Sequence, residues 1–117
     1  LEDQAIKLEA AIDKIATVAM HLGTKIMPKS ISAGFSFSKP FLDATGDIVM
    51  AWMLLWRSTI ASQKIEGASK KDASFYEGQI KSAEYYIYSV IPGTMGSLDA
   101  IINGNDAIVT MSDEAFG

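Results

Sequence analysis

Apolar residues in the first part of the chain recur at alternating intervals of three and four. They form one stripe: Ala5, Leu8, Ile12, Ile15, Ala19, Leu22 and Ile26. This spacing places all of them on one face of an α-helix. The pattern predicts a helix from about Glu2 to Leu22 or slightly beyond, with Gly23 and Pro28 bracketing its end. Residues 27–39 are rich in serine, glycine and lysine without periodicity, which predicts a surface loop.

A second helix is predicted from near Pro40 to about Ile65, before Gly67. Its middle is an unbroken apolar run of nine residues, from Ile48 to Trp56. Such a run is too short to span a bilayer, which needs about 20 apolar residues. A helix without a polar side is typical of one that neighbours cover all round. We therefore expect this helix to be the buried centre of the fold.

A third helix is predicted to begin after Ser69 or Asp72, since both residue types cap helices well. Its stripe keeps its phase through Pro92, which predicts one helix that is kinked or broken at that proline. Asn103-Gly104 is a stop signal, and residues 105–117 are expected to form a short helix or turn that docks back on the bundle. The stripe consists of Tyr76, Ile80, Ala83, Ile87, Ile91, Met95, Leu98 and Ile102.

Together these patterns predict an all-α fold, an antiparallel bundle of three long helices in one domain over residues 1–117. The first residue is Leu1, and helical periodicity begins almost at once, without a targeting segment. We therefore expect a domain excised from a longer chain.

Composition excludes several classes of function. The net charge is −4 and the cations are scattered, which argues against nucleic acid as a partner. The chain has no cysteine, and therefore no disulfide, thiolate nucleophile or cysteine metal site.

Few residues suggest catalysis. His21 is the only histidine, and the Glu-x-x-His pairs of a di-iron bundle are missing, so a structural histidine is the favoured interpretation. Asp43 and Asp47 share a helix face at i and i+4. Paired carboxylates can divide acid–base work, but complementing the positive end of the helix dipole is the favoured interpretation. Glu77 and Lys81 have the order of a favourable surface ion pair.

The aromatic residues and two helical glycines are candidates for packing. Trp52 and Trp56, together with the tyrosine group Tyr85, Tyr86 and Tyr88, could line a pocket or stack a flavin ring, but core packing is the favoured interpretation. Gly46 and Gly78 lie inside predicted helices, where glycine costs roughly 0.5–1 kcal/mol relative to alanine. A close approach of two helices would explain both glycines.

Several motifs also occur together, in this order, in a known family. They are Pro40-Phe41-Leu42, Gly46-Asp47-Ile48-Val49, Ala51-Trp52, Phe75-Tyr76-Glu77-Gly78-Gln79-Ile80, Ala83-Glu84-Tyr85-Tyr86, Ile91-Pro92 and Met111-Ser112-Asp113-Glu114-Ala115-Phe116. The chain resembles the C-terminal domain that follows the dehydrogenase core in a branch of bacterial acyl-CoA dehydrogenases, including those similar to methylthiopropionyl-CoA dehydrogenases. Gln79 and Asp47 depart from the residues common in that family, so neither position is expected to bind something essential.

The resemblance implies a parent enzyme with bound FAD that oxidises an acyl-CoA to the enoyl-CoA and passes electrons to an electron-transfer flavoprotein in the cytoplasm. No residue here matches the family's catalytic or flavin-binding positions, so we assign no catalytic, cofactor-binding or metal residue to this chain. Its implied role is a non-catalytic accessory domain that packs on the upstream dehydrogenase domains or on another copy in a homo-oligomer.

Two alternatives stay open. The chain could be a stand-alone helical module that binds a partner helix or a small apolar ligand, with an adaptable surface from Met20, Met27, Met50, Met53, Met95 and Met111. It could also catalyse a reaction itself through Asp43, Asp47 and His21.

Overall fold

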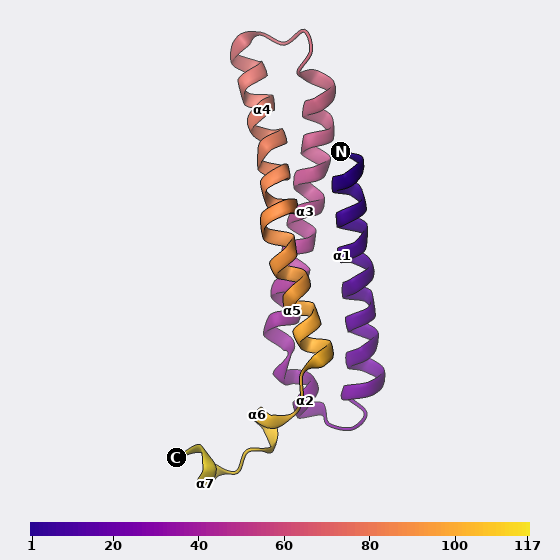
Figure 1. Ribbon diagram of the computed structural model, residues 1–117, viewed down its shortest axis with the longest axis vertical. Helices are drawn as coiled ribbons and strands as arrows, with labels where there is room; N and C mark the ends of the chain where they lie inside the picture. The colour runs from indigo at the N-terminus through magenta and orange to yellow at the C-terminus, as the bar shows by residue number, and fades with distance from the viewer.

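Three long helical segments lie side by side in a narrow rod of 67 × 30 × 16 Å (Figure 1). The computed structural model describes residues 1–117, which form helices and no strand. The first segment is α1 (Glu2–His21) and the second is α3 (Ser38–Lys64). The third consists of α4 (Lys70–Tyr85) and α5 (Ile91–Asn103), joined without a loop. The predicted all-α bundle is confirmed.

The core lies along the line where the three segments meet. Ile87, Leu98 and Ile101 are almost completely buried there, so truncating any of them to alanine should cost about 2–5 kcal/mol. Helices α1 and α3 contribute several alanines, whose small side chains let the helix axes approach closely. The core residues are Leu8, Ala11, Val18, Ala44, Ile48, Ala51, Ile87, Ile91, Leu98 and Ile101.

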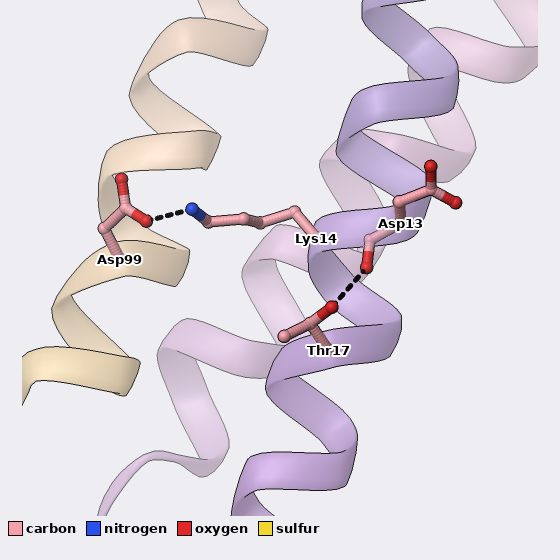
Figure 2. Close-up of polar contacts among 4 residues, drawn as sticks. All are labelled: Asp13, Lys14, Thr17 and Asp99. Atoms are coloured by element: carbon pink, nitrogen blue, oxygen red, sulfur yellow. Dashed lines mark hydrogen bonds and ion pairs between the residues drawn. The ribbon is translucent and has the colours of Figure 1, made fainter.

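Polar contacts join the two outer segments of the bundle. Lys14 of α1 forms an ion pair with Asp99 of α5, and Figure 2 shows its side chain crossing the gap between the two helices. Thr17, one turn further along α1, instead donates a hydrogen bond to the carbonyl oxygen of Asp13 at 3.0 Å within its own helix. Both partners of the ion pair reach solvent, so the pair adds about 1 kcal/mol at most.

Both prolines that follow a long helical stretch come directly after a π-helical turn. The turn η1 (Leu22–Ile26) ends with the N–H of Met27 donating to the carbonyl of Leu22, just before Pro28. The turn η2 (Tyr86–Val90) ends in the same way, with the N–H of Ile91 donating to Tyr86 just before Pro92. In an α-helix a proline ring clashes with the carbonyl group four residues earlier. In a π turn each hydrogen bond spans five residues instead of four, so that carbonyl group no longer faces the proline ring in the α-helical position. The third segment therefore continues through Pro92 instead of breaking.

The turn between α3 and α4 follows the sequence prediction. Gly67 adopts a positive φ of 76°, which only glycine reaches without strain. Ser69 then caps α4, its hydroxyl oxygen accepting the N–H of Asp72 at 3.2 Å.

Two expectations about the irregular parts are wrong. The predicted loop at 27–39 contains a short helix, α2 (Ile31–Ser36), capped by the hydroxyl of Ser30. A helix this short has too few residues to show a period. The C-terminal residues form α6 (Ala107–Thr110) and α7 (Asp113–Phe116), which extend away from the bundle (Figure 1). Helix α6 lies beside α2, but the apolar side chains of this tail are not buried, since every residue from 103 to 117 is exposed.

Helix α3 is not covered on all sides, which corrects the expectation of a wholly buried central helix. One face, with Ala44, Ile48 and Ala51, packs on α1, α4 and α5, while the opposite face is open. The explanation proposed for Gly46 and Gly78 is also wrong within this bundle. A Cβ atom at either glycine would meet nothing within 4 Å.

Candidate functional site

A partly buried polar cluster joins α3 to the third segment around Asp47. The carboxylate of Asp47 is half-buried and accepts a hydrogen bond from the Thr94 hydroxyl at 2.8 Å. It accepts a second one from the Tyr86 hydroxyl at 3.4 Å. Burial, and then the charge and hydrogen bond of Asp47, raise the pKa of Tyr86, so its hydroxyl stays protonated. Both carboxylate oxygens of Asp47 therefore accept hydrogen bonds from side chains of the same chain. These contacts hold α3 against the third segment, which is a structural role.

Asp43 does not join this cluster, although it lies one turn earlier on the same helix. Its carboxylate accepts a hydrogen bond at 2.7 Å from Lys39 on the surface, and that bond raises the pKa of Lys39. Asp43 and Asp47 thus have separate partners. The structure does not assemble them into a pair for acid–base chemistry.

His21 lies apart from both aspartates. It is half-buried at the end of α1 and borders a hollow of about 290 Å³ whose lining includes Lys25 and Ile102 but no carboxylate. No three histidine, cysteine, aspartate or glutamate side chains lie close enough together to hold a metal ion. Asp43 and Asp47 therefore border one groove but bind different side chains, and His21 lies away from both. The predicted ion pair between Glu77 and Lys81 does not form. Lys81 instead forms an ion pair with Glu84 at 3.3 Å.

The tryptophans point outward, which contradicts their predicted place in the core. Trp52 and Trp56 are 51% and 54% exposed, and their rings stack with centroids 5.9 Å apart. Tyr88 is also exposed, and its hydroxyl donates to Asp3, a contact that raises the pKa of Tyr88. Only Tyr86 of the tyrosine group makes a buried contact. The aromatic residues do not line a shared pocket.

The open face of α3 carries a second apolar line of residues, which we call the outer seam. Its members follow one another at intervals of 4, 3, 4, 3 and 4, and the side chains of its five larger residues are 41–70% exposed. Beside its first half lies an open groove of about 860 Å³, between α3 and Ser97 of α5. The outer seam consists of Leu42, Gly46, Val49, Met53, Trp56 and Ile60.

The sequence does contain the signal for this seam. Six of the nine residues in the apolar run from Ile48 to Trp56 belong to two heptad lines on opposite sides of one helix. One line packs in the core, and the other is the outer seam. Long exposed apolar lines are uncommon on monomeric proteins and typically mark an interaction surface.

Comparison with known proteins agrees with the resemblance seen in the motifs. Residues 1–112 match the model of a family described as Acetyl-CoA dehydrogenase C-terminal like. A butyryl-CoA dehydrogenase of Syntrophomonas wolfei is 30% identical over 82 residues, which are 68% of this chain and 13% of that protein. A broad-specificity linear acyl-CoA dehydrogenase of Mycobacterium tuberculosis is 26% identical over 77 residues, 65% of this chain and 13% of that protein.

The chain thus aligns with only about an eighth of the length of these relatives. None of its helices is both long and apolar enough to cross a membrane. The match to the family model covers nearly all of the bundle, including α3 and its outer seam. The chain belongs to the Acetyl-CoA dehydrogenase C-terminal like family.

Proposed function

We propose that this chain is the non-catalytic accessory domain of an acyl-CoA dehydrogenase and acts through its surfaces. The observation that carries the proposal is family membership over residues 1–112, with two curated acyl-CoA dehydrogenases among its relatives. The separation of His21 from the two aspartates, and the bonding of Asp43 and Asp47 to other side chains of the chain, support a role without chemistry of its own. The parent enzyme would oxidise an acyl-CoA thioester to the enoyl-CoA.

The finer features of the parent rest on the resemblance alone. They are bound FAD, transfer of electrons to an electron-transfer flavoprotein, a bacterial source and a cytoplasmic location. The residues of this chain do not fit a flavin. Trp52 and Trp56 stack on each other on an open helix face, whereas a cofactor site encloses most of its ligand. We therefore assign FAD to the part of the parent outside this domain and route no step through residues 1–117.

The experiment is to express the complete reading frame that contains this chain, with and without residues 1–117. We expect the frame to encode a dehydrogenase upstream, and the flavin absorbance and acyl-CoA-dependent dye reduction to require that upstream portion. The 117-residue chain expressed alone should be colourless. A reading frame without a dehydrogenase, or a flavin that copurifies with the isolated chain, would overturn the proposal.

A stand-alone module for a small apolar ligand is the second candidate. The exposed side chains of Met50 and Met53 favour it, because both border the groove beside α3 and methionine adapts to varied ligands. Saturable binding of a fatty acid to the isolated chain, abolished by Met50→Glu, would support this function. Absence of any saturable binding would exclude it for that ligand class.

A further inference from the structure

We propose that a hollow between α3 and α4 binds a small carboxylate that carries an aromatic ring or a branched apolar group. The hollow has a volume of about 160 Å³ and lies where the two helices run side by side near their connecting turn (Figure 1). It shares no lining residue with the groove beside the outer seam. The proposal does not rest on the dehydrogenase assignment. It rests on the shape, the apolar lining and the charge of the hollow.

The helical repeat gathers the lining residues on facing sides of the two helices. Three residues of α3 at i, i+3 and i+4 border the hollow, and three of α4 at i, i+1 and i+4 lie opposite them. Ala61 is only 2% exposed, and its single methyl group leaves part of the space between the helices unfilled. The lining consists of Arg57, Ile60, Ala61, Phe75, Tyr76 and Gln79.

The apolar part of the hollow fits one ring or a branched chain of similar size. The rings of Phe75 and Tyr76 meet edge-on, with centroids 5.7 Å apart and planes at 67°. Aromatic rings favour such contacts, so a third ring can pack against this pair. A cavity of about 150 Å³ is large enough to hold benzene. Phe75 and Ile60 are 59% and 42% exposed, and a bound apolar group would remove part of their surface from water.

The charge beside the hollow indicates what the other end of the ligand carries. Arg57 is the only arginine of the chain, and the lining of the hollow includes no acidic residue. All three ion pairs of the chain use lysines, so the guanidinium group of Arg57 has no acidic partner within it. A guanidinium group presents parallel N–H donors that bind a carboxylate through two hydrogen bonds. The hollow therefore combines an apolar lining with an unpaired cation.

A carboxylate matches this cation better than a phosphate group does. One guanidinium group carries a single positive charge, which one carboxylate neutralises, whereas a phosphate monoester carries about −1.5 to −2 at pH 7. A second donor is available from Tyr76. The tyrosine hydroxyls that form hydrogen bonds within the chain are those of Tyr86 and Tyr88, so the hydroxyl of Tyr76 is free to donate to a ligand.

Nuclear magnetic resonance tests the site at the residue that defines it. Because the chain has one arginine, the Nε–H signal of Arg57 in a ¹⁵N correlation spectrum is unique. Titration of the 117-residue chain with phenylacetate should shift this signal to saturation. We expect a dissociation constant of about 1 mM, as is reasonable for a ligand of about ten non-hydrogen atoms at a site open to solvent. Phenylacetamide, which lacks the charge, and acetate, which lacks the ring, should each bind about tenfold more weakly or worse.

Substitutions separate this site from non-specific binding, with the backbone amide signals of Ala61 and Gln79 as the readout. Arg57→Gln should abolish phenylacetate binding, and Arg57→Lys should weaken it several-fold, because lysine keeps the charge but loses the paired donors. Lys64→Gln is the matched control. It removes a cation from the same helix that does not line the hollow, so the affinity should change by less than about twofold. Helical circular dichroism checks that each variant is folded.

Four outcomes would overturn the proposal. They are a shift that does not saturate, equal affinity for phenylacetate and phenylacetamide, tighter binding of phenyl phosphate than of phenylacetate, and an unchanged affinity in Arg57→Gln. Loss of phenylacetate binding in Met50→Glu would also overturn it, because the ligand would then lie in the groove beside α3.

Equilibrium dialysis of radiolabelled phenylacetate against the complete protein that contains this chain extends the test. We expect binding that Arg57→Gln removes, and its absence would show that the rest of the protein fills the hollow and would refute the proposal. A reading frame without a dehydrogenase would refute the proposed function and leave this site unaffected.

Discussion

The hydrogen bond from Thr94 to Asp47 should contribute strongly to folding, and Thr94→Val removes it. The Thr94 side chain is only 3% exposed, and its hydroxyl lies 2.8 Å from an Asp47 oxygen. Valine has nearly the same shape as threonine but carries a methyl group in place of the hydroxyl. The variant therefore removes the donor without creating a cavity. Asp47 then keeps only the longer bond from Tyr86.

The expected loss follows from the charge and the burial of the acceptor. A hydrogen bond to a charged group is worth about 1.5–3 kcal/mol. Asp47 is half-buried rather than fully buried, so water can replace part of the lost interaction. We therefore expect the unfolding free energy to fall by roughly 1.5–2 kcal/mol. For a domain of this size the melting temperature should fall by about 6–12 °C.

Urea unfolding followed by circular dichroism, at one fixed chain concentration, measures this loss. Thr17→Val is the matched control, because the exposed Thr17 hydroxyl bonds only to a carbonyl of its own helix (Figure 2). It should change the unfolding free energy by less than about 0.5 kcal/mol. The reasoning is refuted if Thr94→Val costs no more than Thr17→Val. The variant Asp47→Asn completes a double-mutant cycle, in which the two losses should not add because the residues share one bond.

Four further changes test other parts of the structure. Gly78→Ala, at an exposed helical position with open space around its Cα, should stabilise the chain by about 0.5–1 kcal/mol in the same urea assay. Gly104→Ala should destabilise it by about 1–3 kcal/mol, because a Cβ there would lie 2.8 Å from a backbone carbonyl oxygen and 3.0 Å from an aromatic ring. Deleting residues 107–117 should change the unfolding free energy by less than about 1 kcal/mol, since all of their side chains are exposed. The raised pKa of Tyr86 favours the folded state below about pH 10 and loses this effect as the pH rises through the folded-state pKa, so Tyr86→Phe should weaken the decline in stability in alkaline urea titrations.

The long helices could be predicted from the sequence because each has an inner apolar line with a regular period. The stripe that ends at Ile102 keeps its phase through Pro92, and this continuity correctly indicated one segment instead of two. The C-terminal residues carry apolar side chains without such a period. Composition alone could not show whether the side chains of Ile108 and Phe116 are buried against the bundle. In the structure both are exposed.

The polar cluster and the outer seam were harder to predict, for different reasons. The partnership of Asp47 with Thr94 joins residues 47 positions apart, and a single sequence carries no information about such a pairing. The outer seam was hidden because Trp52 and its apolar neighbours suggested burial on every side. A heptad interval identifies a face that packs, but it does not say whether the partner is in the same chain. Only the arrangement of α1, α4 and α5 shows which line of α3 is left open.

The central proposal is that this chain is an accessory domain of an acyl-CoA dehydrogenase and carries none of the parent's chemistry. The most direct test is the kcat for acyl-CoA oxidation by the complete enzyme that contains the double substitution His21→Gln and Asp47→Asn, normalised to folded, flavin-loaded protein. The account predicts a kcat within about twofold of the unaltered enzyme, because neither side chain takes part in proton transfer. A loss of about 10²-fold or more, the effect of removing a general acid or base, would contradict it.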